Sequence, residues 1–353
     1  MILVLNAGSS SLKVAVFTPD LTSVLSGAIT SIGTQGQIKL GDMTQPITTA
    51  NHADALAQML AALAQAGITL DRLDAAAHRV VHGGTILTQP ARVTPQVIAA
   101  IQSVIPLAPL HNPHNLAAML ALADAAPDLA QYASFGTAFH ATNPDVATRY
   151  AIPQIQTDAG IRRYGFHGLS YANMVADFGH ALPDRLLALH LGNGASLCAI
   201  RGGKSIATSM GYSPLSGLTM GTRSGDIDGA AVLRMSAALG EAETDRMLNR
   251  NAGLKALAGD NDMRNLLNRD DDAARFAVDH FCYWAARHAG SAIVAMGGID
   301  AVAFTGGIGE NAQPIRDKIM THLACFGDLP VHVIAADEEK QIARDALTVM
   351  GTA

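Results

Sequence analysis

The sequence predicts an α/β protein that contains two copies of one kind of domain. The segments Ile2–Phe17 and Leu186–Ile200 share a pattern: a short apolar strand, a turn rich in Gly, Ser and Asn, and a second apolar strand. Strand-like and helix-like segments alternate along the rest of the chain, as they do in α/β proteins. The length of 353 residues also fits two domains, since one domain usually has about 100–200 residues. Two unrelated hairpins are the alternative explanation of the repeated pattern.

Helices are expected between these strands. Apolar residues recur at helical spacing within residues 56–63. Thr94 followed by Pro95 is typical of a helix N-cap and first helical position, and another apolar stripe follows. Residues 273–296 are apolar on nearly every side, which predicts a buried helix. Further strands are predicted at residues 76–81, 205–209 and 301–305, and a last helix from about Asp337.

Composition and charge narrow the class of protein. Hydrophobic residues make up 49% of the chain and charged residues 15%. That is enough apolar material for large cores and too much for a disordered chain. The net charge of −6 and the lack of Lys or Arg runs argue against binding of a nucleic-acid duplex. A few Arg and Lys residues inside a cleft can still attract a small anion.

The cysteines and the N-terminus indicate where the protein works. Cys198, Cys282 and Cys325 are scattered and form no CxxC pair. Neither a disulfide framework nor a zinc site is therefore expected. The N-terminus lacks the basic region of a signal peptide, and no apolar run reaches the roughly 18 residues of a membrane span. These features predict a cytoplasmic location.

Glycine-rich turns predict contacts with phosphate groups. The tips of the two repeated segments, Asn6–Ser11 and Gly192–Ser196, combine Gly with Ser or Asn. Gly lets the backbone approach a ligand, and the N–H groups of such turns can hold phosphate oxygens. Gly307–Ala312 matches a loose dinucleotide fingerprint, but the roughly 40 residues after it are too few to complete a dinucleotide-binding sheet. A turn against an adenosine or phosphate group is the preferred interpretation, and a plain strand-to-helix turn is the alternative.

Four further segments place Arg or His beside glycines or polar residues: His78–Gly84, Leu110–Asn115, Arg162–Gly168 and Met220–Asp228. Each of them alone could be a surface loop. Together with the phosphate-type turns, they favour a site for anions. His111 and His114 could also ligate a metal, but a His pair without Cys, Asp or Glu nearby is more often structural.

Eight motifs follow one another along the chain: N-A-G-S-S-S-L-K from Asn6, H-R-V-V-H-G-G from His78, P-L-H-N-P from Pro109, T-A-F-H from Thr137, Y-G-F-H-G from Tyr164, H-L-G-N-G-A-S from His190, M-G-T-R-S-G-D-I-D from Met220 and T-G-G-I-G-E-N from Thr305. With these motifs in this order, the sequence resembles the acetate kinase family, which includes propionate and butyrate kinases. The resemblance extends from Ile2 to the final helix.

The resemblance implies a fold and a division of the chain. The fold would be α/β, with two duplicated RNase H-like domains of the actin-like ATPase type around a central cleft. The N-terminal domain would comprise residues 1–140, with a C-terminal helix at about 337–353 packing on it. The nucleotide-binding domain would comprise residues 141–336. Family members are usually homodimers, so a homodimer is expected here.

The resemblance also implies roles for individual residues. Contacts with ATP or ADP would be made by Ser9, Ser11, Lys13, His190, Leu191, Gly192, Asn193, Gly194, Asp262, Met263, Arg264, Gly307, Ile308, Gly309, Glu310 and Asn311. The catalytic residues would be Arg79, Arg223, His167 and His111. The two arginines would hold the carboxylate and the transferring phosphoryl group, and His167 would stabilise the transition state. The acyl pocket would be formed by Val81, Leu110, Phe166 and Pro214 beside Arg79, and Asn6 and Glu338 would lie beside Mg²⁺.

The implied activity is reversible, Mg²⁺-dependent transfer of a phosphoryl group from ATP to acetate, giving acetyl phosphate and ADP by direct in-line transfer. Propionate or butyrate would be alternative acceptors. Such a reaction depends on positioning and charge neutralisation, and Arg suits both. The main departure from the family pattern is Gly136, which stands where the motif F-D-T-A-F-H has an Asp that helps to organise Mg²⁺. A smaller one is His114, where the family usually has Pro. The departure at Gly136 predicts a slower enzyme with a high Mg²⁺ requirement or, at the extreme, a nucleotide-binding homologue with weakened catalysis.

Overall fold

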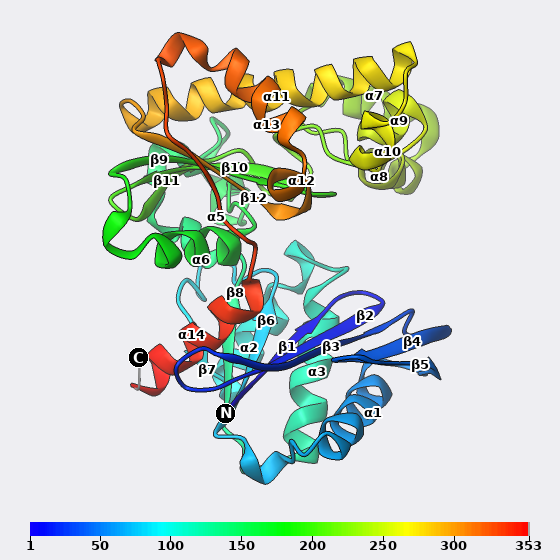
Figure 1. The fold of residues 1–353 in the computed structure, drawn as a ribbon. Coiled ribbons are helices and arrows are strands. Elements are labelled where there is room, and N and C mark those ends of the chain that lie inside the picture. Colours follow the sequence, from blue (N-terminus) through cyan, green and yellow to red (C-terminus); the bar gives the residue numbers. More distant parts are fainter. Residues whose placement is uncertain (352–353) are drawn as a thin grey trace. The chain divides into compact units, whose positions relative to one another are not determined.

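The computed structural model describes residues 1–351, which form two compact units (Figure 1). The first unit comprises Met1–Phe139 and the segment that begins at Asp337, and the second comprises His140–Ala336. The C-terminal segment therefore belongs to the unit that contains the N-terminus. The last two residues of the helix predicted at 337–353 lie outside the described part of the chain.

The first unit is built on a mixed sheet with the strand order β5-β4-β3-β2-β1-β6-β8-β7. Strands β1 to β5 pair antiparallel in succession, β1, β6 and β8 are parallel, and β7 is antiparallel to β8. The strands are β1 (Ile2–Ala7), β2 (Ser11–Phe17), β3 (Ser23–Thr30), β4 (Gln35–Leu40), β5 (Met43–Thr48), β6 (Ala75–Val80), β7 (Ala91–Arg92) and β8 (Gln131–Phe135).

Helices pack on both faces of this sheet. Because side chains alternate along a strand, Leu3 and Leu5 of β1 lie on one face and Asn6 lies on the other. Helices α1 (His52–Gln65) and α3 (Asn112–Ala125) build the core on the Leu3 face. The C-terminal helix α14 (Glu338–Met350) packs on β1, β6 and β8 on the Asn6 face. Helix α2 (Pro95–Ser103) packs on α3.

The second unit repeats the central part of this topology. Its sheet has the order β11-β10-β9-β12-β13, with β9, β10 and β11 antiparallel and with β12 and β13 parallel to β9. Strands β3-β2-β1-β6-β8 of the first unit have the same order and directions. This shared topology confirms the predicted duplicated α/β fold. The strands are β9 (Arg185–Leu191), β10 (Ala195–Arg201), β11 (Lys204–Thr208), β12 (Ala301–Thr305) and β13 (Val331–Val333).

The longest helix of the second unit, α11 (Asp272–Met296), packs on β10, α9 and α13. The prediction of a helix that is buried on every side is wrong, because Phe276, Tyr283 and Val294 are each more than half exposed. The other helices are α4 (Asp145–Thr148), α5 (Gln154–Asp158), α6 (Gly168–Phe178), α7 (Gly229–Leu239), α8 (Glu241–Arg250), α9 (Gly253–Ala258), α10 (Met263–Leu267), α12 (Gly306–Asn311) and α13 (Gln313–His322). Short 3₁₀ helices occur at Leu70–Arg72, Ile105–Leu107, Ala138–Thr142, Gly179–Ala181 and Ala324–Phe326.

Most elements that the sequence predicts are present. The Thr94 side chain accepts a hydrogen bond from the Val97 amide at 3.3 Å, which confirms the N-cap of α2. The helix predicted around residues 56–63 is α1. Strands β6, β11 and β12 lie within one residue of their predicted bounds, whereas β3, β4, β5, β7, β8 and β13 were not predicted. Within residues 1–351, no helix has the length and the apolar character that crossing a membrane requires.

Candidate active site

The first phosphate-type turn connects β1 to β2. The Gly8 amide donates to the Ser11 carbonyl at 2.8 Å, which closes the turn. Ser9 at its tip is exposed, and Ser11 is half-buried. The His52 ring on α1 donates from Nε2 to the Gly8 carbonyl at 2.7 Å, because a carbonyl oxygen can only accept. The His52 ring thus fixes the backbone of the turn, while its serines stay available to a ligand.

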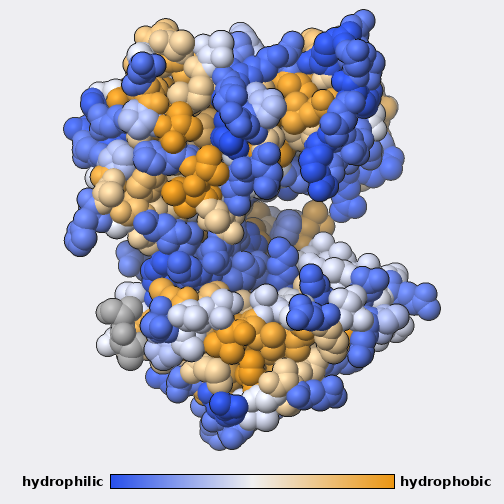
Figure 2. All heavy atoms as spheres, in the orientation of Figure 1, coloured by the Kyte–Doolittle hydropathy of each residue, from blue (hydrophilic) through white to orange (hydrophobic). Residues whose placement is uncertain are grey.

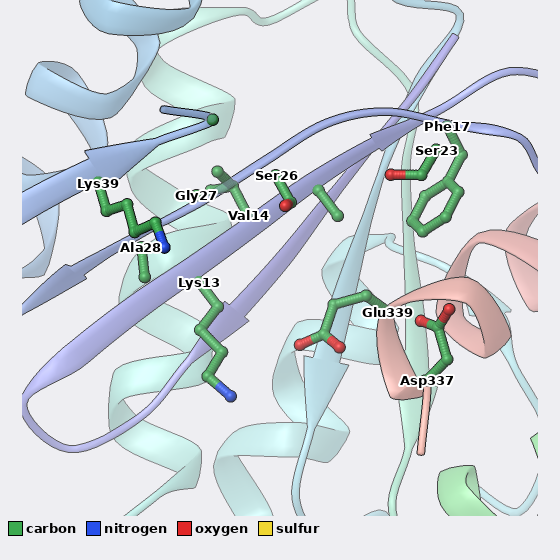
Figure 3. Close-up of a pocket in the computed structure, with 12 residues that line it drawn as sticks. Lys13, Val14, Phe17, Ser23, Ser26, Gly27, Ala28, Lys39, Asp337 and Glu339 are labelled. Carbon is green, nitrogen blue, oxygen red and sulfur yellow. The ribbon is translucent and has the colours of Figure 1, made fainter. Parts of the chain in front are cut away.

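A polar row crosses the sheet on the α14 face. Asn6 pairs with Lys13, Lys13 with Ala28, and Ala28 with Lys39 across successive strands. Directly opposite residues point to the same side of a sheet, so the two lysines flank a small alanine. A cavity of about 490 Å³ lies here, lined by both lysines and by Glu339 of α14 (Figure 3). The sequence predicted Lys13 in this site but missed Lys39 and Glu339.

The first turn of α14 contributes two carboxylates. Glu338 accepts from Arg79 Nε at 2.9 Å, and both side chains are less than one-fifth exposed. Glu339 accepts from the Asn6 amide at 3.0 Å. The structure therefore brings Asn6 to Glu339, whereas Glu338, predicted beside the metal with Asn6, forms an ion pair with Arg79. Oxygen donors of this kind fit Mg²⁺, which proteins usually hold through one or two carboxylates, waters and substrate phosphates.

The loop after β6 carries Val81, which was predicted for the acyl pocket. Asn115 accepts from the Val81 amide at 3.0 Å and donates to the Ala7 carbonyl at 2.6 Å. The asparagine of the histidine-rich segment thus fixes the ends of β1 and β6. Val81 is 8% exposed, while Leu110 is 51% exposed, and His111 lies half-buried at the start of α3. Among residues 1–351, no three His, Cys, Asp or Glu side chains cluster as metal ligands would.

Gly136 follows β8 and is buried beside the same loop. Its amide donates to the Val80 carbonyl at 2.8 Å. A Cβ added at this position would lie 2.9 Å from the Val81 carbonyl oxygen. That distance is shorter than side chains tolerate against backbone, so any larger residue requires the loop to move. The glycine is therefore matched to the local packing of this chain.

In the second unit, two imidazoles stack at the start of α6. The rings of His167 and His190 lie 4.1 Å apart between centroids. His167 has a left-handed backbone with φ of 58°, a conformation that residues other than Gly seldom adopt. Strain of this kind is found at functional sites, where the surrounding structure maintains it.

Arg223 lies in the glycine-rich loop before α7. It donates from Nη1 to the Pro214 carbonyl at 3.1 Å and approaches the Met220 sulfur at 3.6 Å. Within residues 1–351 it forms no ion pair with a carboxylate, and burial lowers the pKa of its guanidinium. An arginine keeps its charge even when partly buried. A charge in this position is stabilised when an anion binds beside it.

The predicted nucleotide segments gather around a second cavity of about 680 Å³. It is lined by Gly192 and Asn193 after β9, by Asp262–Arg264 at the start of α10, and by α12. Within α12, residues Gly307, Ile308 and Asn311 line this cavity. The wall residues that the sequence missed are Asn261, Leu267, Ala312 and Pro314. Each of them lies within a few residues of a predicted nucleotide segment, and this closeness is the signal in the sequence that could have found them.

Several predicted nucleotide residues lie elsewhere. Glu310 accepts from the amides of Gly306 and Ala336, both at 2.9 Å, so its carboxylate joins α12 to the segment that follows β13. His190 stacks on His167 rather than lining the cavity, and Leu191 is fully buried in β9. Gly194 and Gly309 are not among the lining residues either.

Comparison with known proteins points to one family. A model described as the Acetokinase family matches residues 1–348. A protein named acetate kinase from Streptomyces avermitilis is 40% identical over 399 aligned residues, which cover 100% of this chain and 98% of that protein. Another, from Rhodopseudomonas palustris strain TIE-1, is 42% identical over 348 residues, covering 93% and 87%.

Two solved structures are similar over their full length. A propionate kinase from Francisella tularensis subsp. tularensis has a TM-score of 0.92 and 34% identity, covering 98% of both chains. The acetate kinase of Porphyromonas gingivalis has a TM-score of 0.92 and 32% identity, covering 99% of both chains.

Proposed function

Because the chain belongs to the acetokinase family, we propose that it is a cytoplasmic acetate kinase that transfers a phosphoryl group reversibly between ATP and acetate. The observation that carries this proposal is Arg223, a partly buried cation beside His167 with no carboxylate partner among residues 1–351. Both substrates of the reaction are anions, and so is acetyl phosphate.

The residues of each unit supply what in-line phosphoryl transfer requires. In the second unit, the cavity at Gly192, Asp262 and Gly307 holds the nucleoside. Arg223 and His167 neutralise charge on the transferring group. In the first unit, Arg79 binds the acceptor carboxylate with its guanidinium fork, in exchange for part of its pairing with Glu338.

We further propose that Asn6, Glu338 and Glu339 take part in holding Mg²⁺. When bound, Mg²⁺ would neutralise the phosphate oxygens of the nucleotide. Asn6 and Glu339 already contact each other at 3.0 Å. Glu339 and Lys13 both line the cavity of the first unit. Glu339 is the residue that this structure adds to the two that the resemblance implies.

A homodimer is also part of the proposal. Leu233 of α7 is 72% exposed and Val294 of α11 is 75% exposed. Figure 2 shows patches of hydrophobic residues on the surface of the body that carries α11. Exposed apolar patches of this kind mark sites of association.

Trapping of the acyl phosphate tests the activity. Incubation with ATP, Mg²⁺, acetate and hydroxylamine should produce acetohydroxamate, and omission of ATP should abolish it. Propionate and butyrate in parallel reactions give the acyl preference, which we expect to be acetate, with propionate accepted weakly. ATP binding without any hydroxamate would instead favour a nucleotide-binding homologue.

Val81 is expected to limit the size of the acyl group. Its side chain is nearly buried in the loop after β6, and one methylene in an apolar pocket changes discrimination by about 1–3 kcal/mol. Val81→Ala should therefore shift kcat/KM from acetate toward propionate or butyrate. Val97→Ala removes a similar side chain from α2 and should leave the ratio unchanged. An unchanged ratio in Val81→Ala would place the pocket elsewhere.

Two substitutions of Gly136 separate the effect of a carboxylate on activity from the effect of local packing. Any Cβ here meets the Val81 carbonyl at 2.9 Å, so Gly136→Ala should lower both activity and thermal stability. Gly136→Asp carries the same steric cost but restores the carboxylate of the family pattern. We expect it to exceed Gly136→Ala in kcat and to need less Mg²⁺ for half-maximal rate. Equal kcat values and equal Mg²⁺ dependence in the two variants would show that a carboxylate here has no role.

A further inference from the structure

Two buried hydroxyl groups form a hydrogen-bonded chain that ends at the His167 ring. Its Nδ1 lies 2.8 Å from Ser196 Oγ on β10. Ser196 Oγ lies in turn 2.6 Å from the Tyr171 hydroxyl on α6. Ser196 and Tyr171 are both 0% exposed, and Tyr171 also packs edge-on against the His140 ring at 5.7 Å. Ser196 ends the second phosphate-type turn of the sequence, which was expected to act through its N–H groups, and Tyr171 belongs to none of the motifs.

The direction of the hydrogen bonds follows from the chemistry of the three groups. A phenol is more acidic than an alkyl hydroxyl, so it is the better donor in a short contact with serine. Burial raises the pKa of Tyr171 well above its usual value, so the phenol keeps its proton at neutral pH.

Tyr171 therefore directs its proton to Ser196, and Ser196 directs its own proton to His167 Nδ1. The imidazole then carries its proton on Nε2. In the reverse direction, Nδ1 would hold the proton, and Nε2 would present a bare lone pair.

The surroundings of His167 Nε2 show why the tautomer matters. A Cβ added to Gly194 would lie 3.3 Å from His167 Nε2 and 3.5 Å from Arg223 Nη1. Nε2 and the guanidinium thus both lie close to one glycine of the second phosphate-type turn. An anion held by Arg223 would be repelled by a lone pair on Nε2 and bound by an N–H group there.

We propose that Tyr171 and Ser196 are positioning residues that fix His167 in the tautomer with its proton on Nε2, so that a neutral imidazole donates to an oxygen of the anion bound at Arg223. The nature of that anion rests on the proposed function, and the tautomer does not. The serine on the neighbouring ring is separate, since Ser170 Oγ contacts His190 Nδ1 at 2.9 Å. The two stacked imidazoles are therefore each held through Nδ1 by their own serine.

Nitrogen NMR of protein labelled with ¹⁵N-histidine tests the tautomer directly. The His167 signals are assigned by their loss in His167→Gln. In the unaltered protein, we expect Nδ1 to be unprotonated and Nε2 to carry the proton. A proton on Nδ1 would overturn the proposal without the need for any other variant.

Two variants test the positioning residues. Tyr171→Phe keeps the ring and removes the hydroxyl, and Ser196→Ala removes the direct partner of His167. In either one, the two tautomers should become mixed. Loss of such a supporting partner typically lowers activity about 10–100-fold, and we expect this in kcat with little change in the KM for acetate. Tyr283→Phe removes an exposed phenol on α11, far along the chain from these motifs, and should change neither readout.

The outcomes are separable from those of the proposed function. An unchanged tautomer in a folded Tyr171→Phe and a folded Ser196→Ala would refute the positioning role even in an active kinase. A mixed tautomer in these variants, in a chain that forms no acetohydroxamate, would support the positioning role and defeat the proposed substrate.

Discussion

Arg223→Ala is expected to lower turnover by about 10²–10³-fold, the usual effect of removing one preorganised donor to a transition-state charge. The same change should not lower the thermal midpoint. The guanidinium is partly buried and gives up only a hydrogen bond to the Pro214 carbonyl and a contact with the Met220 sulfur. Removing a cation that has no carboxylate partner among residues 1–351 relieves a desolvation cost. Activity and stability should therefore separate in this variant.

Arg79→Ala should lower turnover by a similar factor, about 10²–10³-fold, but its effect on stability should differ. Its guanidinium pairs with Glu338 at 2.9 Å, and both side chains are mostly buried. The variant leaves that carboxylate without its partner, so the thermal midpoint should fall. Arg79→Ala combined with Glu338→Gln should recover the midpoint and not the turnover.

Steady-state assays of turnover and thermal unfolding of the three variants test these expectations. Arg246→Ala is a suitable control, because its guanidinium pairs with Glu243 on the exposed surface of α8. Such pairs contribute little to stability. Near-normal turnover in Arg79→Ala or Arg223→Ala would remove that residue from the proposed anion site. A lowered midpoint in Arg223→Ala would show that its contacts matter more for folding than its unpaired charge.

Features that depend on short stretches of sequence could be predicted. The N-cap at Thr94 and the turns at Gly8 and Gly192 depend on neighbouring residues, and a local pattern contains that information. The gathering of Asp262–Arg264 and Gly307 around one cavity could also be expected, because each segment carries a recognisable motif.

Features set by pairing between distant strands could not be predicted. Lys39 reaches the cavity of Lys13 only because β4 pairs with β3 in one particular register, and a shift by one residue would turn it to the other face. Strand β3 buries only one side chain and β5 buries none, so they lack the alternation of buried and exposed residues that marks a strand. Ser196 ends the second phosphate-type turn, but its side chain is buried in β10, and its contact with His167 joins residues 29 positions apart that no local pattern connects.

Acid should destabilise both units well before their carboxylates are protonated. Burial lowers the pKa of His78, His82 and His140 to about 4 in each case. In the unfolded chain these imidazoles titrate near 6.5. The unfolded state therefore binds more protons between those values, so stability is complete above about pH 6.5 and is lost as the pH falls toward 4. The shift corresponds to at most about 3 kcal/mol for each histidine.

Urea unfolding at pH 7.5 and pH 5.0 measures this loss. His78→Gln and His140→Gln remove one titrating group from the first and the second unit, and each should flatten the pH dependence, whatever its stability at pH 7.5. His180→Gln changes an exposed ring and should leave the dependence as it is. Asp345 acts in the opposite sense, because burial raises the pKa of its carboxyl and favours folding at low pH. Since all variants retain Asp345, equal slopes in His78→Gln, His140→Gln and the unaltered protein would show that these imidazoles do not drive the acid response.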